Sequence, residues 1–147
     1  MPWLYLICRN ALPSSSVGRK FVQILEDEKA ERSSIMAGKG EVIACRTVGS
    51  WKQQLLKGKQ SNKLIVVDFT AAWCGPCRAM APVFAELAKK MSNVIFLKVD
   101  VDELMAVAAE WGVSALPCFM FLKNGKVVDR FVGARKDQLQ KIVLQNA

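Results

Sequence analysis

The 147-residue chain contains no histidine, and this absence excludes Ser-His and Cys-His catalytic dyads as well as metal sites built on imidazole ligands. Acid–base chemistry would therefore fall to Asp, Glu, Lys, Tyr or Cys. Long apolar runs are also missing. The longest stretch without a charge covers the 12 residues 111–122, whereas a membrane-spanning helix needs about 20 apolar residues. The sequence excludes a transmembrane protein, and we expect no membrane partner.

Acidic residues are fewer than basic ones, 13 against 21, which gives a net charge of +8. Such a balance can indicate a nucleic-acid or other anionic partner. Here the basic residues are scattered in ones and twos among the acids, and no motif interleaves aromatic with basic side chains. We therefore interpret the charge as a solvated basic surface and expect no nucleic-acid partner.

Length and composition predict one compact domain, because 147 residues with 52% hydrophobic residues suffice for one core but not for two ordinary domains. Residues 1–35 lack a sustained helix or strand period, and we expect them to form a disordered extension ahead of a domain at residues 36–147. Two alternatives stay open for the extension. It is either a mitochondrial or plastid transit peptide, because basic residues and serines precede its first acid, or sequence ahead of a functional start at Met36.

Periodic segments alternate with turn residues from residue 36 onward. We expect strands at residues 41–46, 63–70, 94–99, 118–123 and 126–132, and helices at 47–58, 74–91, 102–111 and from 136. Gly58 is expected to end the first helix and Asp102 to cap the third. The pair Asn124-Gly125 predicts a two-residue hairpin turn. This order predicts an α/β fold with a mixed sheet, parallel in the centre with an antiparallel edge hairpin, and helices on both faces.

The cysteines are odd in number and irregularly spaced, which is not the framework of a small secreted disulfide scaffold. They are Cys8, Cys45, Cys74, Cys77 and Cys118. Only one close pair exists, whereas zinc sites usually draw on two such pairs or on a pair plus histidine. A metal site is therefore a minor alternative, and we expect none.

The segment WCGPC follows a predicted strand and opens a predicted helix. Residues three apart in a first helical turn have Cα atoms about 5 Å apart, so Cys74 and Cys77 can form a reversible disulfide. Free amides and the helix dipole favour an anion there, which lowers the pKa of the Cys74 thiol and makes it the candidate nucleophile. Cys77, one turn further in, is the candidate resolving thiol. Pro76 removes an amide donor and should make the site more reducing, while Gly75 leaves room for a target backbone and Trp73 supplies an apolar rim.

Asp68 interrupts the apolar run at residues 64–69, six residues before Cys74. A buried carboxylate is unfavourable unless it is neutral or partnered, so we expect its pKa to be raised. Such a group can take the Cys77 proton directly or through a water, which makes Asp68 a general-base candidate. The alternative is an aspartate at a frayed strand end that faces solvent. Lys98 is either its charge partner or an exposed strand lysine.

Three segments and a glycine carry a family resemblance: VVDFTAAWCGPC at residues 66–77, FLKVDVDE at 96–103, WGVSALPCFMFLKNGK at 111–126, and Gly133. They resemble the thioredoxin family, and their detailed sequence is similar to that of its plant h-type members. The resemblance covers essentially residues 41–147. It implies a thioredoxin fold and a protein-disulfide reductase that acts by dithiol exchange.

The resemblance also implies roles for individual residues. Cys74 would attack a target disulfide, Cys77 would resolve the mixed disulfide, and Asp68 would assist proton transfer. Pro117 would be cis, an isomer that the residues alone do not determine. The implied target groove consists of Trp73, Gly75, Pro76, the Leu116 backbone, Pro117 and Gly133.

The resemblance implies no bound cofactor, because electrons would come from NADPH through a flavoprotein thioredoxin reductase. The other partners would be disulfide-containing proteins, and we expect a cytoplasmic monomer. An oxidase or isomerase is disfavoured because no histidine separates the two cysteines, and a docking module with incidental cysteines stays open. Cys118 departs from the threonine usual after the proline, so this thiol near the groove either joins in exchange or is an ordinary core cysteine.

Overall fold

The computed structural model describes residues 23–25 and 40–147, and the chain divides into two units, residues 1–35 and residues 36–147. In the first unit the described residues 23–25 are helical and exposed. The prediction that residues 1–35 are disordered otherwise falls on residues that lie outside the described part of the chain. Within the described ranges, no helix is both long enough and apolar enough to cross a membrane.

The described part of the second unit alternates strands and helices in the predicted order. Its elements are β1 (Val42–Cys45), α3 (Val48–Ser61), β2 (Ile65–Thr70), α4 (Gly75–Lys90), β3 (Ile95–Asp100), α5 (Met105–Glu110), β4 (Cys118–Lys123), β5 (Lys126–Val132) and α6 (Lys136–Asn146).

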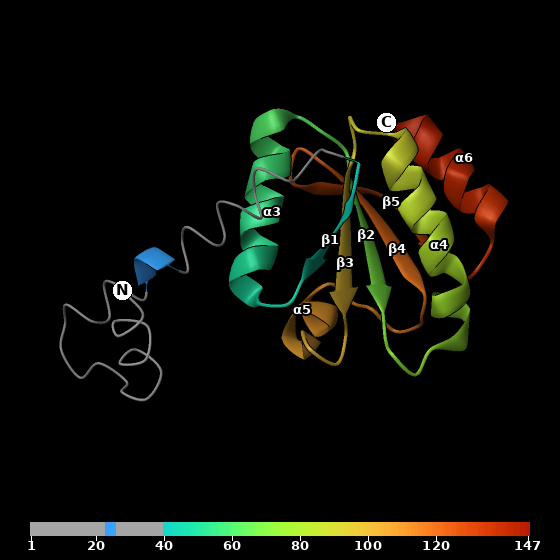
Figure 1. The fold of residues 1–147 in the computed structure, drawn as a ribbon, viewed down its shortest axis with the longest axis horizontal. Coiled ribbons are helices and arrows are strands. Elements are labelled where there is room, and N and C mark those ends of the chain that lie inside the picture. Colours follow the sequence, from blue (N-terminus) through green and yellow to red (C-terminus); the bar gives the residue numbers. More distant parts are fainter. Residues whose placement is uncertain (1–22, 26–39) are drawn as a thin grey trace, which may run out of the picture. The chain divides into compact units, whose positions relative to one another are not determined.

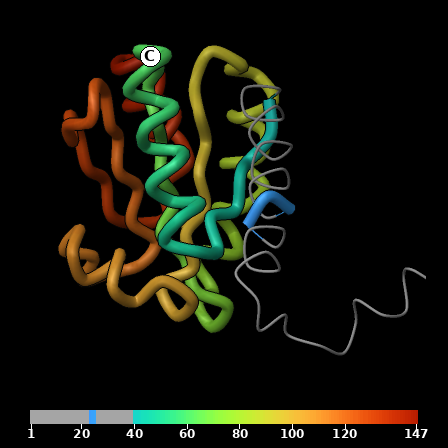
Figure 2. Tube along the Cα trace, turned by 90° about the vertical axis from the view of Figure 1, so that its left-hand side faces the viewer, coloured from blue at the N-terminus to red at the C-terminus, as the bar shows by residue number. Residues whose placement is uncertain are grey.

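The strands form one sheet in the order β1-β3-β2-β4-β5. Strands β1, β3 and β2 are parallel, and the hairpin β4–β5 is antiparallel to β2. Helices α3 and α5 cover one face, and α4 and α6 cover the other (Figure 1). Viewed from the α3 side, this helix lies in front of the sheet and runs roughly along the strands (Figure 2). The predicted mixed sheet with helices on both faces is confirmed.

Strand β2 is buried along its whole length, and its side chains alternate between two cores. Val66 packs with Phe84 and the rest of the cluster beneath α4 and α6. Val67 and Phe69 pack with Trp51 and the rest of the cluster beneath α3 and α5. Burying an apolar side chain of this size contributes about 1.5–3 kcal/mol, so β2 is a rigid base for the loop and helix that follow it.

The prediction that Gly58 ends the first helix is wrong. Thr47 and Ser50 form a capping box at the start of α3, and the helix continues to Ser61. Asn62 caps its end in the left-handed conformation, with a φ of 53°. Gly58 lies inside the helix, at a position where a Cβ atom would overlap the side chain of Ile65. The glycine permits close helix–sheet packing instead of terminating the helix.

Two other local predictions have opposite outcomes. Helix α5 begins at Met105, after Leu104, and has no side-chain cap, so the prediction that Asp102 caps it is wrong. The hairpin turn is confirmed, because Asn124 and Gly125 have φ values of 54° and 76° between the last two strands. The turn residues determine the hairpin locally, whereas the Asp102 carboxylate is engaged by a distant side chain.

Candidate active site

A disulfide joins Cys74 and Cys77 at the N-terminus of α4, with their Cα atoms 5.3 Å apart. Cys74 is the N-cap residue, and its Sγ accepts a hydrogen bond from the Cys77 N–H at 3.2 Å. The first turn of a helix presents amides without intrahelical partners, so negative charge on this sulfur is favoured there. The two cysteines are 5% and 2% exposed, which makes Cys77 the more buried by a small margin.

Gly75 and Pro76 occupy the first two positions of α4, and both are exposed. The nearest atom to a Cβ built on Gly75 would be Nη2 of Arg78 at 4.0 Å, so the surface above this residue is open. Pro76 sits where a helix tolerates proline, because the amide hydrogen it lacks would have no intrahelical partner. The pair leaves the disulfide approachable by a polypeptide backbone.

The rim beside the disulfide is the side chain of Trp73, which is 70% exposed. Its indole Nε1–H donates to Oδ2 of Asp102 at 3.0 Å. The Asp102 N–H in turn donates to Oδ1 of Asp100 at 2.8 Å, at the end of β3. An exposed apolar ring is therefore held in place by a carboxylate that was expected to cap a helix.

The segment before β4 reaches the disulfide from the other side. The Leu116–Pro117 peptide bond is cis, as the resemblance implies, and Leu116 packs against the cluster of Ala71 and the two cysteines. The Pro117 carbonyl accepts from the N–H of Gly133 at 3.0 Å, where Gly133 has a φ of 126° that favours glycine.

A groove of about 230 Å³ lies between these walls. It is lined by Trp73, Val101, Val113, Ser114, Ala115 and Leu116. The sequence reasoning missed Val101 and residues 113–115, because no local motif marks them as groove residues. The other expected groove residues do not line the groove itself. Pro117 follows the lining residue Leu116, and Gly133 bonds to Pro117. Gly75 and Pro76 begin α4, beyond Cys74.

Asp68 is 2% exposed on β2 and pairs in register with Lys98 of β3. Burial raises the pKa of its carboxyl from 3.8 to about 7, while the Lys98 ammonium acts in the opposite direction. Within residues 40–147 its Oδ1 has no hydrogen-bond partner. The carboxyl is therefore a group that takes up and releases a proton near neutral pH. The alternative of an aspartate facing solvent at a frayed strand end is not what the structure shows.

Cys118 is 1% exposed and opposes Phe69 of β2. Its side chain belongs to the core beneath α3 and α5, and it is a free thiol. Burial raises its pKa, and the positive charge of the Arg130 guanidinium acts in the opposite direction. The thiol lies in the core and is not among the groove-lining side chains.

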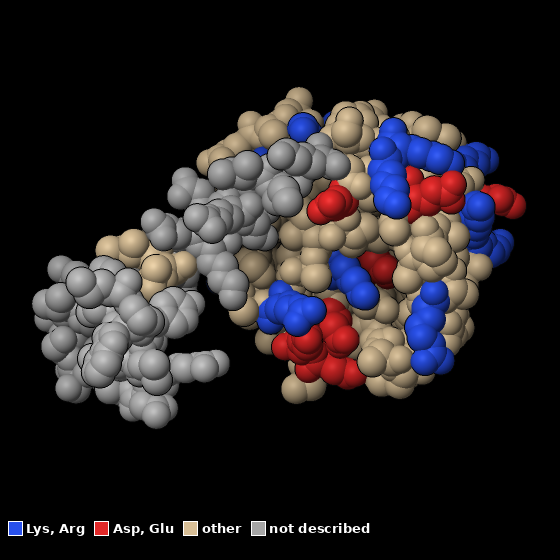
Figure 3. All heavy atoms as spheres, in the orientation of Figure 1, with Lys and Arg blue, Asp and Glu red and all other residues tan. Residues whose placement is uncertain are grey.

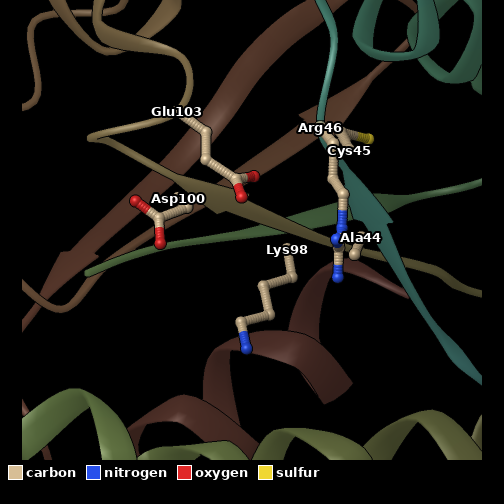
Figure 4. Close-up of a pocket in the computed structure, with 6 residues that line it drawn as sticks. All are labelled: Ala44, Cys45, Arg46, Lys98, Asp100 and Glu103. Carbon is tan, nitrogen blue, oxygen red and sulfur yellow. The ribbon is translucent and has the colours of Figure 1, made fainter. Parts of the chain in front are cut away.

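Cys45 ends β1, away from the disulfide, and is also buried and free. Burial raises the pKa of its thiol to about 11, against a smaller lowering by a hydrogen bond with Ser50. It borders a small pocket of about 100 Å³, where Figure 4 shows Arg46 and Lys98 extending to the same side of the sheet. The complete lining is Ala44, Cys45, Arg46, Lys98, Asp100 and Glu103. Its mixed charges and small size do not suit the binding of a target chain.

Metal ligands are not gathered at the disulfide. In the portion of the chain that the structure describes, no three Cys, Asp or Glu side chains lie together as a candidate metal site. The chemistry available at the N-terminus of α4 is thiol–disulfide exchange between two cysteines.

The thioredoxin family model matches residues 42–145, which is most of the chain and includes the disulfide, Asp68 and the cis-proline. The chain belongs to the thioredoxin family. Thioredoxin H1 of Arabidopsis thaliana is 59% identical over 107 residues, covering 73% of this chain and 94% of its own length. An H-type thioredoxin of Ricinus communis is 60% identical over 110 residues, covering 75% and 93% respectively.

A solved structure supports the same placement. The crystal structure of the thioredoxin NaTrxh from Nicotiana alata superposes with a TM-score of 0.70 at 51% identity, covering 72% of this chain and 92% of that chain. The relatives place the domain among the h-type thioredoxins of plants, and its thioredoxin fold is confirmed. The chain is therefore a protein-disulfide reductase of a family without a bound cofactor, whose partners are disulfide-containing proteins and thioredoxin reductase.

Proposed function

We propose that Cys74 and Cys77 perform the reduction by two successive thiol–disulfide exchanges. In the reduced protein the Cys74 thiolate attacks one sulfur of a target disulfide, forms a mixed disulfide with it and releases the other target sulfur as a thiolate. The Cys77 thiolate then attacks the Sγ of Cys74, which re-forms the Cys74–Cys77 disulfide and releases the second target thiolate. Two electrons pass to the target, and the protein ends in its disulfide form.

The observation that carries this proposal is the disulfide at the N-cap of α4. The more exposed sulfur receives the amide hydrogen bond, so the thiolate of Cys74 is the one that the helix start stabilises. Cys77 is more enclosed and needs a base before it can attack. Asp68 is our candidate for that base, directly or through a water, because its pKa of about 7 lets it accept a proton at neutral pH.

The target chain would lie along the groove between Trp73 and residues 113–116. Apolar side chains of the target would contact the indole and Leu116, while its backbone would approach over Gly75 and pass Pro117 and Gly133. Gly75 and Pro76 would set how readily the disulfide is reduced. Cys118, buried in the opposite core, would stay outside the exchange.

Reduction of the insulin interchain disulfides tests the proposal, with dithiothreitol or NADPH and a thioredoxin reductase as the electron source. We expect the wild type to be much faster than dithiothreitol alone, Cys74→Ser to be inactive and Cys118→Ser to keep wild-type activity. Equal rates for wild type and dithiothreitol would contradict the mechanism. Full activity of Cys74→Ser would favour the docking-module interpretation.

We propose NADPH, through a flavoprotein thioredoxin reductase, as the electron source and the cytoplasm as the place of action, which the kinship with h-type thioredoxins supports. The protein would act as a monomer and without nucleic acid. On the face shown in Figure 3, basic and acidic side chains are interspersed, which offers no single-sign surface to a phosphate backbone.

The proposed cytoplasmic location, and with it the role of residues 1–35 ahead of the domain at residues 36–147, is tested by fluorescent fusions with and without residues 1–35. Cytoplasmic signal from both fusions supports the proposal. Mitochondrial or plastid signal from the longer fusion alone would make residues 1–35 a transit peptide.

A further inference from the structure

Arg130 of β5 donates from Nη2 to two backbone carbonyl oxygens, that of Trp111 at 2.7 Å and that of Gly112 at 3.0 Å. These carbonyls follow directly after α5, where the last carbonyls of a helix lack intrahelical partners and the helix dipole is negative. A guanidinium is suited to this position because it presents several donors in a fixed plane with a permanent positive charge.

The same strand leads into the hydrogen bond that holds the other end of this loop. One residue past β5, the Gly133 N–H donates to the Pro117 carbonyl at 3.0 Å. Between the two attachments lie residues 113–116, which supply four of the six residues that line the groove. The Val113 N–H still bonds back to Ala108 at 2.9 Å, but within the described ranges no backbone hydrogen bond ties residues 114–116 to another element.

The positive charge of the Arg130 guanidinium also acts on Cys118, the residue that follows the cis-proline, where it opposes the rise of the thiol pKa caused by burial. Arg130 therefore holds the residues that lead into the groove segment, through Trp111 and Gly112. The other end is held by the bond from Gly133 to Pro117.

We propose that Arg130 is a positioning residue that holds residues 113–116 in the conformation that binds a target polypeptide. This inference rests on the proposed function. A segment freed from Arg130 would have to be ordered when a target binds, and the conformational entropy lost on ordering it opposes binding. Arg130 touches neither sulfur of the disulfide, so the exchange step itself should not depend on it.

The test compares Arg130→Met with the wild type in single-turnover oxidation of the pre-reduced protein. Insulin reports on a polypeptide target, and 5,5′-dithiobis(2-nitrobenzoate) reports on a small disulfide that has no backbone to lay along the groove. For insulin, we expect the half-saturating concentration to rise about fivefold, which corresponds to the loss of roughly 1 kcal/mol, with the limiting rate unchanged. The rate with the small disulfide should stay within about twofold.

Two further variants separate positioning from charge and from folding. Lys126→Met removes a charge from the same strand without touching the groove segment, and it should match the wild type with both disulfides. Arg130→Lys keeps the charge but not the planar fork, and it should recover part of the affinity for insulin. Amide hydrogen exchange of Arg130→Met should accelerate at residues 113–116 and stay unchanged in β2.

An equal loss with insulin and with the small disulfide would overturn the proposal, as would an unchanged half-saturating concentration. Faster exchange throughout the sheet would assign Arg130 a general structural role instead. These outcomes are distinct from failure of the proposed function, which would show as a wild-type protein unable to reduce insulin at all.

Discussion

The exposed indole of Trp73 is fixed by Asp102, which lies 29 residues later in the chain and accepts the Nε1–H at 3.0 Å. An apolar ring that is 70% exposed would otherwise sample several rotamers. The hydrogen bond keeps the ring as one wall of the groove and couples it to the loop that follows β3. The rim of the groove is thus ordered before a target arrives.

Replacing Asp102 with Ala should therefore weaken the binding of protein targets. Loss of one solvent-exposed hydrogen bond of about 1 kcal/mol predicts a roughly fivefold rise in the insulin concentration at half-saturation. Asp102→Asn is the matched control, because its side-chain oxygen still accepts from the indole, and it should lie close to the wild type. Identical kinetics for the Ala and Asn variants would show that the contact does not order the groove.

Asp68 should make stability depend on pH in a defined direction. Its pKa is raised to about 7 in the folded protein from an ordinary 3.8, so between these values the folded chain holds a proton that the unfolded chain has lost. The free energy of unfolding therefore falls as pH rises through this window and stays lower above it. Asp68→Asn removes the ionisation and should stabilise the disulfide form by roughly 4 kcal/mol at about pH 8, with little difference at about pH 4.

Urea unfolding of the wild type and Asp68→Asn at the two pH values measures this effect. A gain of the same size at both pH values would mean that the stabilisation comes from packing or hydrogen bonding. Such a result would give no support to a raised pKa of Asp68.

The described cysteines of the reduced protein should differ in reactivity. Burial raises the pKa of Cys45 to about 11 and also raises that of Cys118, whereas Cys74 lies at a helix start that favours its thiolate. Brief treatment with iodoacetamide at about pH 7 should modify Cys74 well ahead of Cys45 and Cys118. Peptide mass spectrometry of native and urea-unfolded samples provides the comparison. If Cys118 were labelled as fast as Cys74 in the native protein, Cys118 would again be a candidate for taking part in thiol–disulfide exchange.

Gly58 should resist replacement although it lies inside a helix, where alanine is usually the better residue. A Cβ atom would overlap Ile65, so Gly58→Ala should destabilise the protein by about 1–3 kcal/mol. Gly49→Ala is the matched control in the same helix, because the nearest atom to its new methyl group would be Thr47 Oγ1 at 3.8 Å. It should be neutral or stabilising by up to about 1 kcal/mol. Similar unfolding midpoints for the two variants would contradict the packing explanation.

The parts of the molecule that depend on nearby residues could be predicted from sequence. The Cys74–Cys77 disulfide follows from a spacing of three at a helix start, and the Asn124-Gly125 turn follows from two residues that tolerate positive φ. The mixed sheet follows from the order of apolar segments. The burial of Asp68 was predictable because apolar residues precede and follow it in one strand.

The contacts that sequence reasoning missed join residues that are distant in the chain. Asp102 looked like a helix cap because it precedes a helix, yet Trp73 engages its carboxylate. The basic residues were interpreted together as a solvated surface, yet Arg130 bonds carbonyls 18 and 19 residues away. Neither contact has a local periodicity or motif, so only the packed fold reveals them.

The antiparallel pairing of β2 with β4 has a consequence for synthesis on the ribosome. Phe69 faces Cys118, which is translated 49 residues later, and the Gly133 amide that supports Pro117 is translated later still. A nascent chain that has just completed β3 already carries WCGPC but lacks the strands that bring Pro117 and the groove segment to it. Contacts between residues so far apart also form slowly, because closing a long loop costs conformational entropy. The chain therefore carries both cysteines of the disulfide before it carries the residues that complete the target groove.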